Sequence, residues 1–437
     1  MKRIAVVNLG CKVNRYDALA LQARLDPAHF CLVDESQHAD LYVVNSCTVT
    51  HAAGARSLKA VRQIARRHPD RPIVFTGCHA TLAPDEAQAT GAVARVVDNE
   101  GKAGLPALIA ELLQESMAEV RPPFPVPDLA RPVVKVQDGC DQRCAYCIVP
   151  RVRGRSRSVS VEQVLRQVEQ LVGLGYPEVV LTGIHLGDYG KGLDGDLDLA
   201  GLVRRLLDAT EVRRIRLSSV DPLELTPALV ELVTTHPRLC AHLHLPLQSG
   251  SDTVLRAMRR PYDRARVREL LHAILAASPA LAVGLDVIVG FPGEGEVEFE
   301  ETRALLDELD LAYLHVFPFS RRPGTAAAGL KHRVPESITK DRAALLRELS
   351  DDKSRAFYAR QQGRSHTMVV ECAAAEPGWM RGTSDNYLDL VVATQAPVGS
   401  LLEVELIDAA RPARAQQRRE LARPAKPLRA VDEEEPA

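Results

Sequence analysis

The stretch Asp138-Gly-Cys140-Asp-Gln-Arg-Cys144-Ala-Tyr-Cys147 contains three cysteines, separated first by three residues and then by two. It directly follows an apolar stretch, Val133–Val136, that predicts a β-strand. In βα-barrels, the end where a strand stops carries the functional residues. Three thiolates suit a four-iron cluster and leave one iron open for a ligand. The alternatives are unrelated thiols or a structural zinc site. A zinc site takes four protein ligands, and no fourth Cys or His lies at the required spacing.

A series of strands and helices surrounds this motif. The candidate strands are Val133–Val136, Glu178–Leu181, Arg214–Leu217, Ala241–Leu245, Leu281–Val289 and Tyr313–Val316. Six βα units predict a partial (βα)6 barrel over residues 133–362, because a full eight-unit barrel needs about 250 residues. Small or polar residues stand where four strands stop: Gly183, Ser219, Gln248 and Gly290. Their shared position predicts a cofactor pocket, with ordinary turn chemistry as the alternative.

Residues 1–120 also alternate short apolar runs with helical stretches, which predicts a parallel, Rossmann-like α/β domain. Cys11, Cys47 and Cys78 each follow a predicted strand of this domain. Parallel strands end along one edge of a sheet, so the three thiols should converge there and hold a second cluster. The alternative is that buried cysteines are common. The remaining three cysteines lack this pattern and are interpreted as structural thiols: Cys31, Cys240 and Cys372.

The rest of the chain is divided by composition. The Pro-rich residues 121–132 predict a linker. Short strand patterns over residues 363–410 predict a small β-barrel. Residues 411–437 are basic and then acidic, and are expected to form a tail that binds RNA backbone or is merely disordered.

The composition is that of an ordinary globular protein, with 46% hydrophobic and 26% charged residues. A net charge of −2 restricts any nucleic-acid surface to a local patch. Neither a signal peptide nor an apolar run of membrane-spanning length is recognisable, so a cytoplasmic location is expected. Nine cysteines in a reducing compartment favour metal or redox use over disulfides.

The motifs around both cysteine sets resemble the radical-SAM methylthiotransferases, from about Leu9 to Leu406. The matching segments are Gly10-Cys-Lys-Val-Asn14, Asn45-Ser-Cys-Thr-Val-Thr50, Thr76-Gly-Cys78, Cys147-Ile-Val-Pro150, Arg153-Gly-Arg-Ser-Arg157, Leu181-Thr-Gly-Ile-His185, His315-Val-Phe-Pro-Phe-Ser320 with Gly324-Thr325, and Thr383-Ser-Asp-Asn-Tyr387. The most similar branch acts on N6-threonylcarbamoyladenosine in tRNA. Ser46 stands where Thr is usual and Asp17 where Glu is usual; neither difference removes a ligand.

This resemblance implies two [4Fe-4S] clusters, S-adenosylmethionine (SAM) and a C-terminal TRAM barrel. One SAM would methylate sulfur and another would supply a 5′-deoxyadenosyl radical, so that a methylthio group is added at C2 of the modified adenosine next to the anticodon. The expected partners are that tRNA, an electron donor such as flavodoxin or ferredoxin, and a sulfur source. A methylthiotransferase acting on a ribosomal-protein aspartate and a non-catalytic iron–sulfur RNA-binding protein are the alternatives.

Four alternating arginines follow the central cysteines: Arg151, Arg153, Arg155 and Arg157. If this segment is extended, the alternation places all four on one side. Guanidinium groups suit RNA phosphates, so these four are candidate RNA contacts. The alternative is a solvated loop whose arginines pair with carboxylates.

Overall fold

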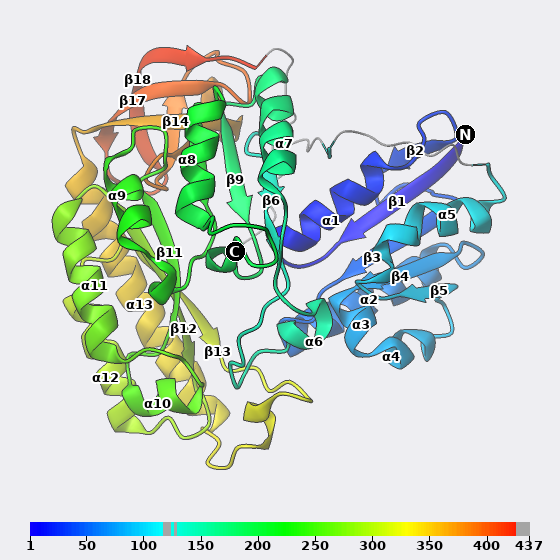
Figure 1. Cartoon of the computed structure of the whole chain (residues 1–437), viewed down its shortest axis with the longest axis horizontal. Helices are drawn as coiled ribbons and strands as arrows, with labels where there is room; N and C mark the ends of the chain where they lie inside the picture. The colour runs from blue at the N-terminus through cyan, green and yellow to red at the C-terminus, as the bar shows by residue number, and fades with distance from the viewer. Residues whose placement is uncertain (117–123, 126–128, 425–437) are drawn as a thin grey trace. The chain divides into compact units, whose positions relative to one another are not determined.

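The computed structural model describes residues 1–116, 124–125 and 129–424 (Figure 1). The chain divides into two compact units. Unit 1 consists of Met1–Pro127, Asp138–Arg157 and Ser320–Gly329, and unit 2 of Asp128–Gln137, Ser158–Phe319 and Leu330–Ala437. The central cysteine loop therefore belongs to the compact unit of the N-terminal domain, whereas the sequence grouped it with the barrel. Residues 121–123 and 126–128 of the expected linker, and the acidic run at residues 432–435, lie outside the described residues.

Unit 1 is built on a parallel sheet with the strand order β2-β1-β3-β4-β5. Its strands are β1 (Lys2–Asn8), β2 (Phe30–Val33), β3 (Leu41–Ser46), β4 (Ile73–Gly77) and β5 (Arg95–Val97). Every residue of β3 and β4 is buried, as expected for central strands of a parallel sheet covered on both faces. The prediction of a parallel, Rossmann-like domain is confirmed.

Helices complete the described part of unit 1. They are α1 (Lys12–Ala23), α2 (His51–Arg67), α3 (Cys78–Leu82), α4 (Pro84–Gln88), η1 (Gly101–Gly104), α5 (Leu105–Leu113), α6 (Val149–Arg153) and η4 (Ala326–Gly329). Thr50 caps α2 by accepting a hydrogen bond from the Ala53 backbone N–H, which satisfies one of the first free donors of the helix. Helix α1 begins immediately after Cys11. Cys11 and Cys47 thus lie shortly before α1 and α2, and Cys78 is the first residue of α3.

Unit 2 contains the predicted six parallel strands in two sheets, β10-β9-β6 and β11-β12-β13. An isolated parallel bridge pairs Ile215 of β10 with Leu239, three residues before β11. The strands are β6 (Val133–Lys135), β9 (Glu178–Thr182), β10 (Arg214–Leu217), β11 (His242–Gln248), β12 (Ala282–Val289) and β13 (Tyr313–Pro318). A short pair, β7 (Gln137–Asp138) with β8 (Arg157–Ser158), flanks the cysteine loop. The partial (βα)6 barrel is confirmed.

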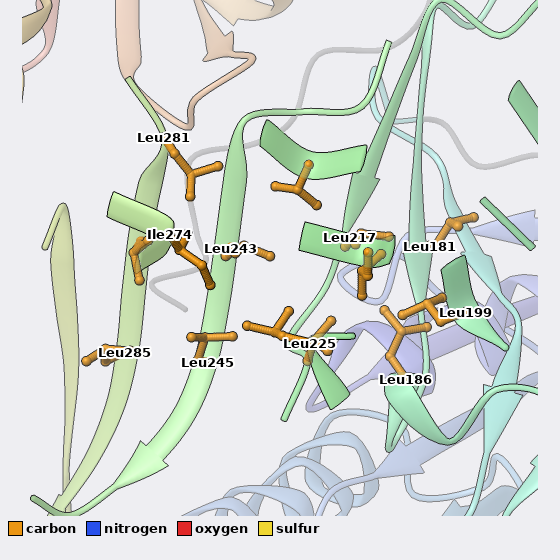
Figure 2. Close-up of a cluster of buried hydrophobic side chains, with 14 of the residues drawn as sticks. Leu181, Leu186, Leu199, Leu217, Leu225, Leu243, Leu245, Ile274, Leu281 and Leu285 are labelled. Atoms are coloured by element: carbon orange, nitrogen blue, oxygen red, sulfur yellow. The ribbon is translucent and has the colours of Figure 1, made fainter. Parts of the chain in front are cut away.

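Helices separate the barrel strands and bury one apolar core with them. They are α7 (Val161–Gly173), η2 (Leu186–Asp188), α8 (Leu199–Ala209), η3 (Pro222–Glu224), α9 (Pro227–Thr235), α10 (Asp252–Ala257), α11 (Arg264–Ala277), α12 (Glu296–Glu308) and α13 (Glu336–Gln361). Figure 2 shows part of this core, where leucines of β9, β10, β11 and β12 meet side chains of α8 and α11. Apolar burial of this extent is the main force that holds the strands together.

A closed five-stranded barrel ends the described chain, with the strand order β14-β15-β16-β18-β17. Its strands are β14 (Ser365–Ala373), β15 (Trp379–Ser384), β16 (Asp389–Ala393), β17 (Leu401–Asp408) and β18 (Ala413–Ala422). The expected small β-barrel is present, but strand β18 lies in what the sequence assigned to the basic tail. Buried Ala413 and Ala415 alternate with exposed polar residues, and this period of two is the pattern of a strand.

Candidate functional site

The three cysteines at the ends of β1, β3 and β4, here called the sheet cysteines (Cys11, Cys47 and Cys78), converge at one edge of the unit 1 sheet. Glycines make their close approach possible. A Cβ atom at Gly10, whose φ is +108°, would lie 2.7 Å from both Cβ and Sγ of Cys47. Gly77 has a φ of +94°, and its Cβ would lie 2.5 Å from the Ser46 carbonyl oxygen. Both positions therefore require glycine, because the conformation and the space exclude a side chain.

Hydrogen bonds hold the turns that carry the sheet cysteines. The Asn14 Nδ2 group donates to the Leu9 oxygen at 2.6 Å and to the Ser46 oxygen at 3.0 Å, which ties the first two turns together. The Cys47 backbone N–H donates to Ser57 Oγ at 3.1 Å. Because these donors and acceptors are backbone groups and buried polar side chains, the cysteine turns are fixed by the fold rather than by the thiols themselves.

The electrostatics of the sheet cysteines show that their sulfur atoms influence one another. Burial raises the pKa of the Cys47 thiol, and negative charge on Cys11 and Cys78 raises it further. The Asn99 Nδ2 group lies 3.6 Å from Cys78 Sγ as a donor and also donates to the Val152 oxygen at 2.7 Å. Three thiols close enough to repel one another as thiolates are a donor set that a cationic iron–sulfur cluster would satisfy.

The central motif, here called the loop cysteines (Cys140, Cys144 and Cys147), forms a compact turn in the same unit. The Cys147 N–H donates to the Cys144 oxygen at 3.1 Å, and the Gln142 N–H lies 3.4 Å from Cys140 Sγ. Gly139 precedes the motif with a φ of +75°, and a Cβ there would lie 2.0 Å from the Arg155 oxygen. All three thiols are partly exposed, which leaves them accessible to a cluster with one open iron.

Cys31, Cys240 and Cys372, which were interpreted as structural thiols, differ in burial. Cys240 is buried, and its burial raises the pKa of the thiol to about 12, so that it stays protonated. Cys31 and Cys372 are partly exposed.

The expected row of RNA-binding arginines is only partly consistent with the structure. The segment Val149–Arg153 is helix α6, so the expected extended alternation is wrong there. Arg153 is 5% exposed and pairs with Asp17 and Asp138, which removes it from any surface row. Arg155 and Arg157 are exposed, and Arg151 donates to the Gly324 oxygen at 3.1 Å. The period of two failed because local helix formation rotates successive side chains by about 100° instead of 180°.

The candidate cofactor residues of unit 2 lie where its parallel strands stop. Gly183 follows β9, Ser219 comes two residues after β10, Gln248 ends β11 and Gly290 follows β12. Gln137 Oε1 accepts a hydrogen bond from the His185 N–H at 2.8 Å. A Cβ atom at Gly183 would lie only 2.8 Å from the same oxygen, so a side chain at this position would crowd the bond. Their binding of SAM stays a prediction.

Close to Gly183 lies His185, which the sequence comparison placed in a matching segment without assigning it a role. His185 Nδ1 lies 3.1 Å from Asp188 Oδ2, and its Nε2 lies 2.6 Å from Glu224 Oε1. Burial on its own raises the pKa of Asp188, but hydrogen bonds from His185 and Lys191 lower it to about 2. One ligand atom of each of these three side chains lies within 4.8 Å of the others, so the imidazole and the two carboxylates form one compact polar group.

A second histidine network runs across β11, β12 and β13. Asp286 Oδ1 lies 2.8 Å from His244 Nε2 and 3.3 Å from His315 Nδ1. The Tyr313 hydroxyl lies 2.8 Å from His242 Nε2 and 2.9 Å from His244 Nδ1. The available signal was the alternation of polar ring side chains with apolar residues, His242 and His244 in β11 and Tyr313 and His315 in β13, because a period of two places such residues on one face of a strand.

Comparison with known proteins gives these features a context. The Radical SAM superfamily matches residues 134–306, and Uncharacterized protein family UPF0004 matches residues 3–98. Threonylcarbamoyladenosine tRNA methylthiotransferase MtaB of Bacillus subtilis is 36% identical, over 94% of this chain and 95% of its own. The protein of the same name from Aquifex aeolicus is 35% identical, over 92% and 99% of the two chains.

Among solved structures, the chain resembles the radical S-adenosylmethionine methyltransferase TsrM of Kitasatospora setae. The TM-score is 0.55 at 13% identity, with 89% of this chain and 82% of that chain covered, so this likeness concerns the fold. In the part of the chain that the structure describes, no helix is both long and apolar enough to span a membrane. With relatives of this identity covering nearly its whole length, the chain belongs to the radical-SAM methylthiotransferase family.

Proposed function

We propose that the protein adds a methylthio group to C2 of N6-threonylcarbamoyladenosine at position 37 of tRNA. One observation carries this proposal: unit 1 brings together three sheet cysteines and also contains the loop cysteines. Radical chemistry alone needs one cluster with an open iron, whereas sulfur insertion needs a second site that holds sulfur. The identity to relatives named for this substrate supports the tRNA nucleoside over a ribosomal-protein aspartate.

In this proposal the six cysteines hold two [4Fe-4S] clusters, one on Cys140, Cys144 and Cys147 and the other on Cys11, Cys47 and Cys78. The donor sets fit such clusters, because each offers three thiols and N–H groups directed at sulfur. When bound, the clusters and SAM supply the hydrogen-abstracting radical and the methylated sulfur. The chain itself positions the thiols and keeps the turns of the sheet cysteines rigid through buried hydrogen bonds.

Further parts of the proposal concern binding. Gly183, Ser219, Gln248 and Gly290 are proposed to bind SAM, because small and polar groups at strand ends let a ligand approach the backbone. Arg151, Arg155 and Arg157 remain candidate contacts to tRNA phosphates. An electron donor such as flavodoxin or ferredoxin and a sulfur source would complete the cycle in the cytoplasm.

The decisive test is mass spectrometry of tRNA nucleosides from a strain that lacks the gene. We expect the methylthio nucleoside to disappear while its threonylcarbamoyl precursor accumulates, and the wild-type gene to restore it. Persistence of the nucleoside, together with loss of a methylthio group from a ribosomal aspartate, would show that the substrate is wrong.

The cluster assignment has its own test. After anaerobic reconstitution, the variant with the loop cysteines replaced by Ala should keep about half of the iron, and so should the variant with the sheet cysteines replaced. Full iron retention in either variant would contradict the ligand assignment.

A further inference from the structure

One buried guanidinium connects the two cysteine motifs. Arg153, in the helix that follows the loop cysteines, directs Nη1 to Asp138, the residue two before Cys140, at 3.1 Å. The same Nη1 lies 3.1 Å from Asp17 Oδ2 in helix α1, which begins after Cys11. Its Nη2 donates to Asn14 Oδ1 at 2.8 Å. All these residues belong to unit 1.

Asn14 makes this contact a link to the turns of the sheet cysteines. The same side chain donates through Nδ2 to the carbonyl oxygens of Leu9 and Ser46, which flank Cys11 and Cys47. Arg153 therefore contacts, through one amide, the two turns that present those thiols. Because an amide offers one acceptor oxygen and two N–H donors, Asn14 satisfies all three groups at once.

Burying the charges of Arg153 and its carboxylate partners costs desolvation free energy, which the ion pairing only partly offsets. The Arg153 side chain is 2% exposed and Asp17 is 8% exposed. A buried ion pair often contributes no more stability than apolar residues of the same volume. A second, partly buried cation, Lys102, contacts Asp17 at 2.8 Å, so two positive and two negative side chains share this region. A fixed positive charge at this place would, however, stabilise the negative charge on the sulfur atoms of a nearby cluster.

Arg153 is also linked to Cys78, because Asn99 Nδ2 donates to the oxygen of the preceding residue, Val152, at 2.7 Å and lies 3.6 Å from Cys78 Sγ. Burial on its own lowers the pKa of its guanidinium, but negative charge on Cys78, Asp17, Asp138 and Cys11 together raises it. Lys102 also interacts with Cys78. One-electron reduction adds negative charge to a cluster, and a nearby buried cation stabilises the reduced form because the local dielectric constant is low.

We infer that Arg153 is a positioning residue that fastens the loop cysteines to the edge of the unit 1 sheet and raises the reduction potential of the cluster on the sheet cysteines. This inference rests on the proposed function, since it assumes that the sheet cysteines hold a cluster. It replaces the expected role of Arg153 as an RNA contact.

The experiment measures the midpoint potential of that cluster alone. The background is the full-length protein with Cys140, Cys144 and Cys147 replaced by Ala, and the readouts are iron per chain and potentiometric EPR. Arg153→Gln should lower the ratio of reduced to oxidised cluster at least tenfold at a fixed potential, which equals about 59 mV for a one-electron couple. Arg153→Lys keeps the charge and should restore most of the potential.

Two further variants control this experiment. Arg71→Gln removes the same charge from a partly exposed pair with Asp40 in the same unit and should leave the potential unchanged. Asp138→Asn removes a negative charge beside Arg153 and should move the potential in the opposite, positive direction. If Arg153→Gln loses its iron, this opposite shift decides the outcome.

The measurements distinguish the presence of a cluster on the sheet cysteines from the effect of Arg153 on its reduction potential. No iron in the background protein would refute the cluster on the sheet cysteines, and with it the proposed function. Iron present with an unchanged potential in Arg153→Gln would overturn the role of Arg153 while the cluster assignment stands. An unchanged potential in Asp138→Asn, when the Gln variant has lost iron, would overturn it as well.

Discussion

Replacing Glu178 with Gln should strongly destabilise unit 2. This carboxylate is fully buried at the start of β9. Arg216 Nε lies 2.9 Å from its Oε1, Arg214 pairs with its Oε2, and Arg131 Nη1 is 3.9 Å away. Arg214 also donates to the Thr367 oxygen of the C-terminal barrel at 2.7 Å. The variant would therefore leave buried guanidinium charges uncompensated where the two barrels of unit 2 meet.

The magnitude follows from the ionisation of Glu178. Burial on its own raises its pKa, but Arg214, Arg216 and Arg131 lower it from 4.5 to about 2. A displacement of this size corresponds to about 3 kcal/mol. This value agrees with the cost of about 3–5 kcal/mol for breaking a buried ion pair by removing one partner. Since 1 kcal/mol shifts the Tm of a domain of 150–250 residues by about 2–4 °C, we expect the Tm to fall by roughly 10 °C.

Thermal unfolding of the full-length protein, followed by circular dichroism at neutral pH, measures this change. The folded pKa of Glu178 is depressed, so its contribution is complete above the unfolded value of 4.5 and is lost as pH falls toward 2. The difference between wild type and Glu178→Gln should therefore shrink in acid. Glu300→Gln, which breaks an exposed pair with Arg303, is the control and should leave the Tm unchanged. Equal Tm values for wild type and Glu178→Gln would refute this reasoning.

Three other changes have defined outcomes. Gly10→Ala should lose about half of the reconstituted iron, because its Cβ would overlap Cys47. The control Gly104→Ala, whose Cβ would have no neighbour within 4 Å, should retain the iron. Equal iron contents in the two variants would contradict the steric reasoning. Arg155→Glu should weaken tRNA binding and reduce the slope of log affinity against log salt, as measured by filter binding; an unchanged slope would place this side chain outside the RNA interface. Tyr313→Phe should cost about 1–3 kcal/mol in chemical denaturation, because it leaves two buried histidine nitrogens without their shared hydroxyl, and a neutral effect would show that these contacts are dispensable.

The C-terminal barrel also changes how its tail can be tested. Truncation after Ala410 was the natural cut from the sequence, but it would remove β18, which pairs with both β16 and β17. Loss of tRNA binding in that variant would then report unfolding of the barrel. A cut after Pro424 leaves all five strands intact and removes only residues outside the described part of the chain.

The sequence by itself was sufficient to predict the two cysteine sets and the strands that carry them. Both patterns are local: a strand's apolar run and the cysteine at its end lie within about ten residues. In a parallel sheet, all strands end at one edge, so topology alone predicts that Cys11, Cys47 and Cys78 meet. Barrel strands β9 and β12 followed from similar reasoning, because buried parallel strands are largely apolar runs.

Only the tertiary structure decided which polar residues are buried and with whom. Arg153 and Asn14 are 139 residues apart, and no local pattern distinguishes a buried arginine from its exposed neighbours Arg155 and Arg157. Strand β18 was missed for a similar reason: its basic residues suggested a tail, whereas in the folded chain β18 pairs with β16 and β17, and Ala413 and Ala415 are buried. Burial and ion pairing depend on contacts between distant segments, and those contacts exist only once the chain is folded.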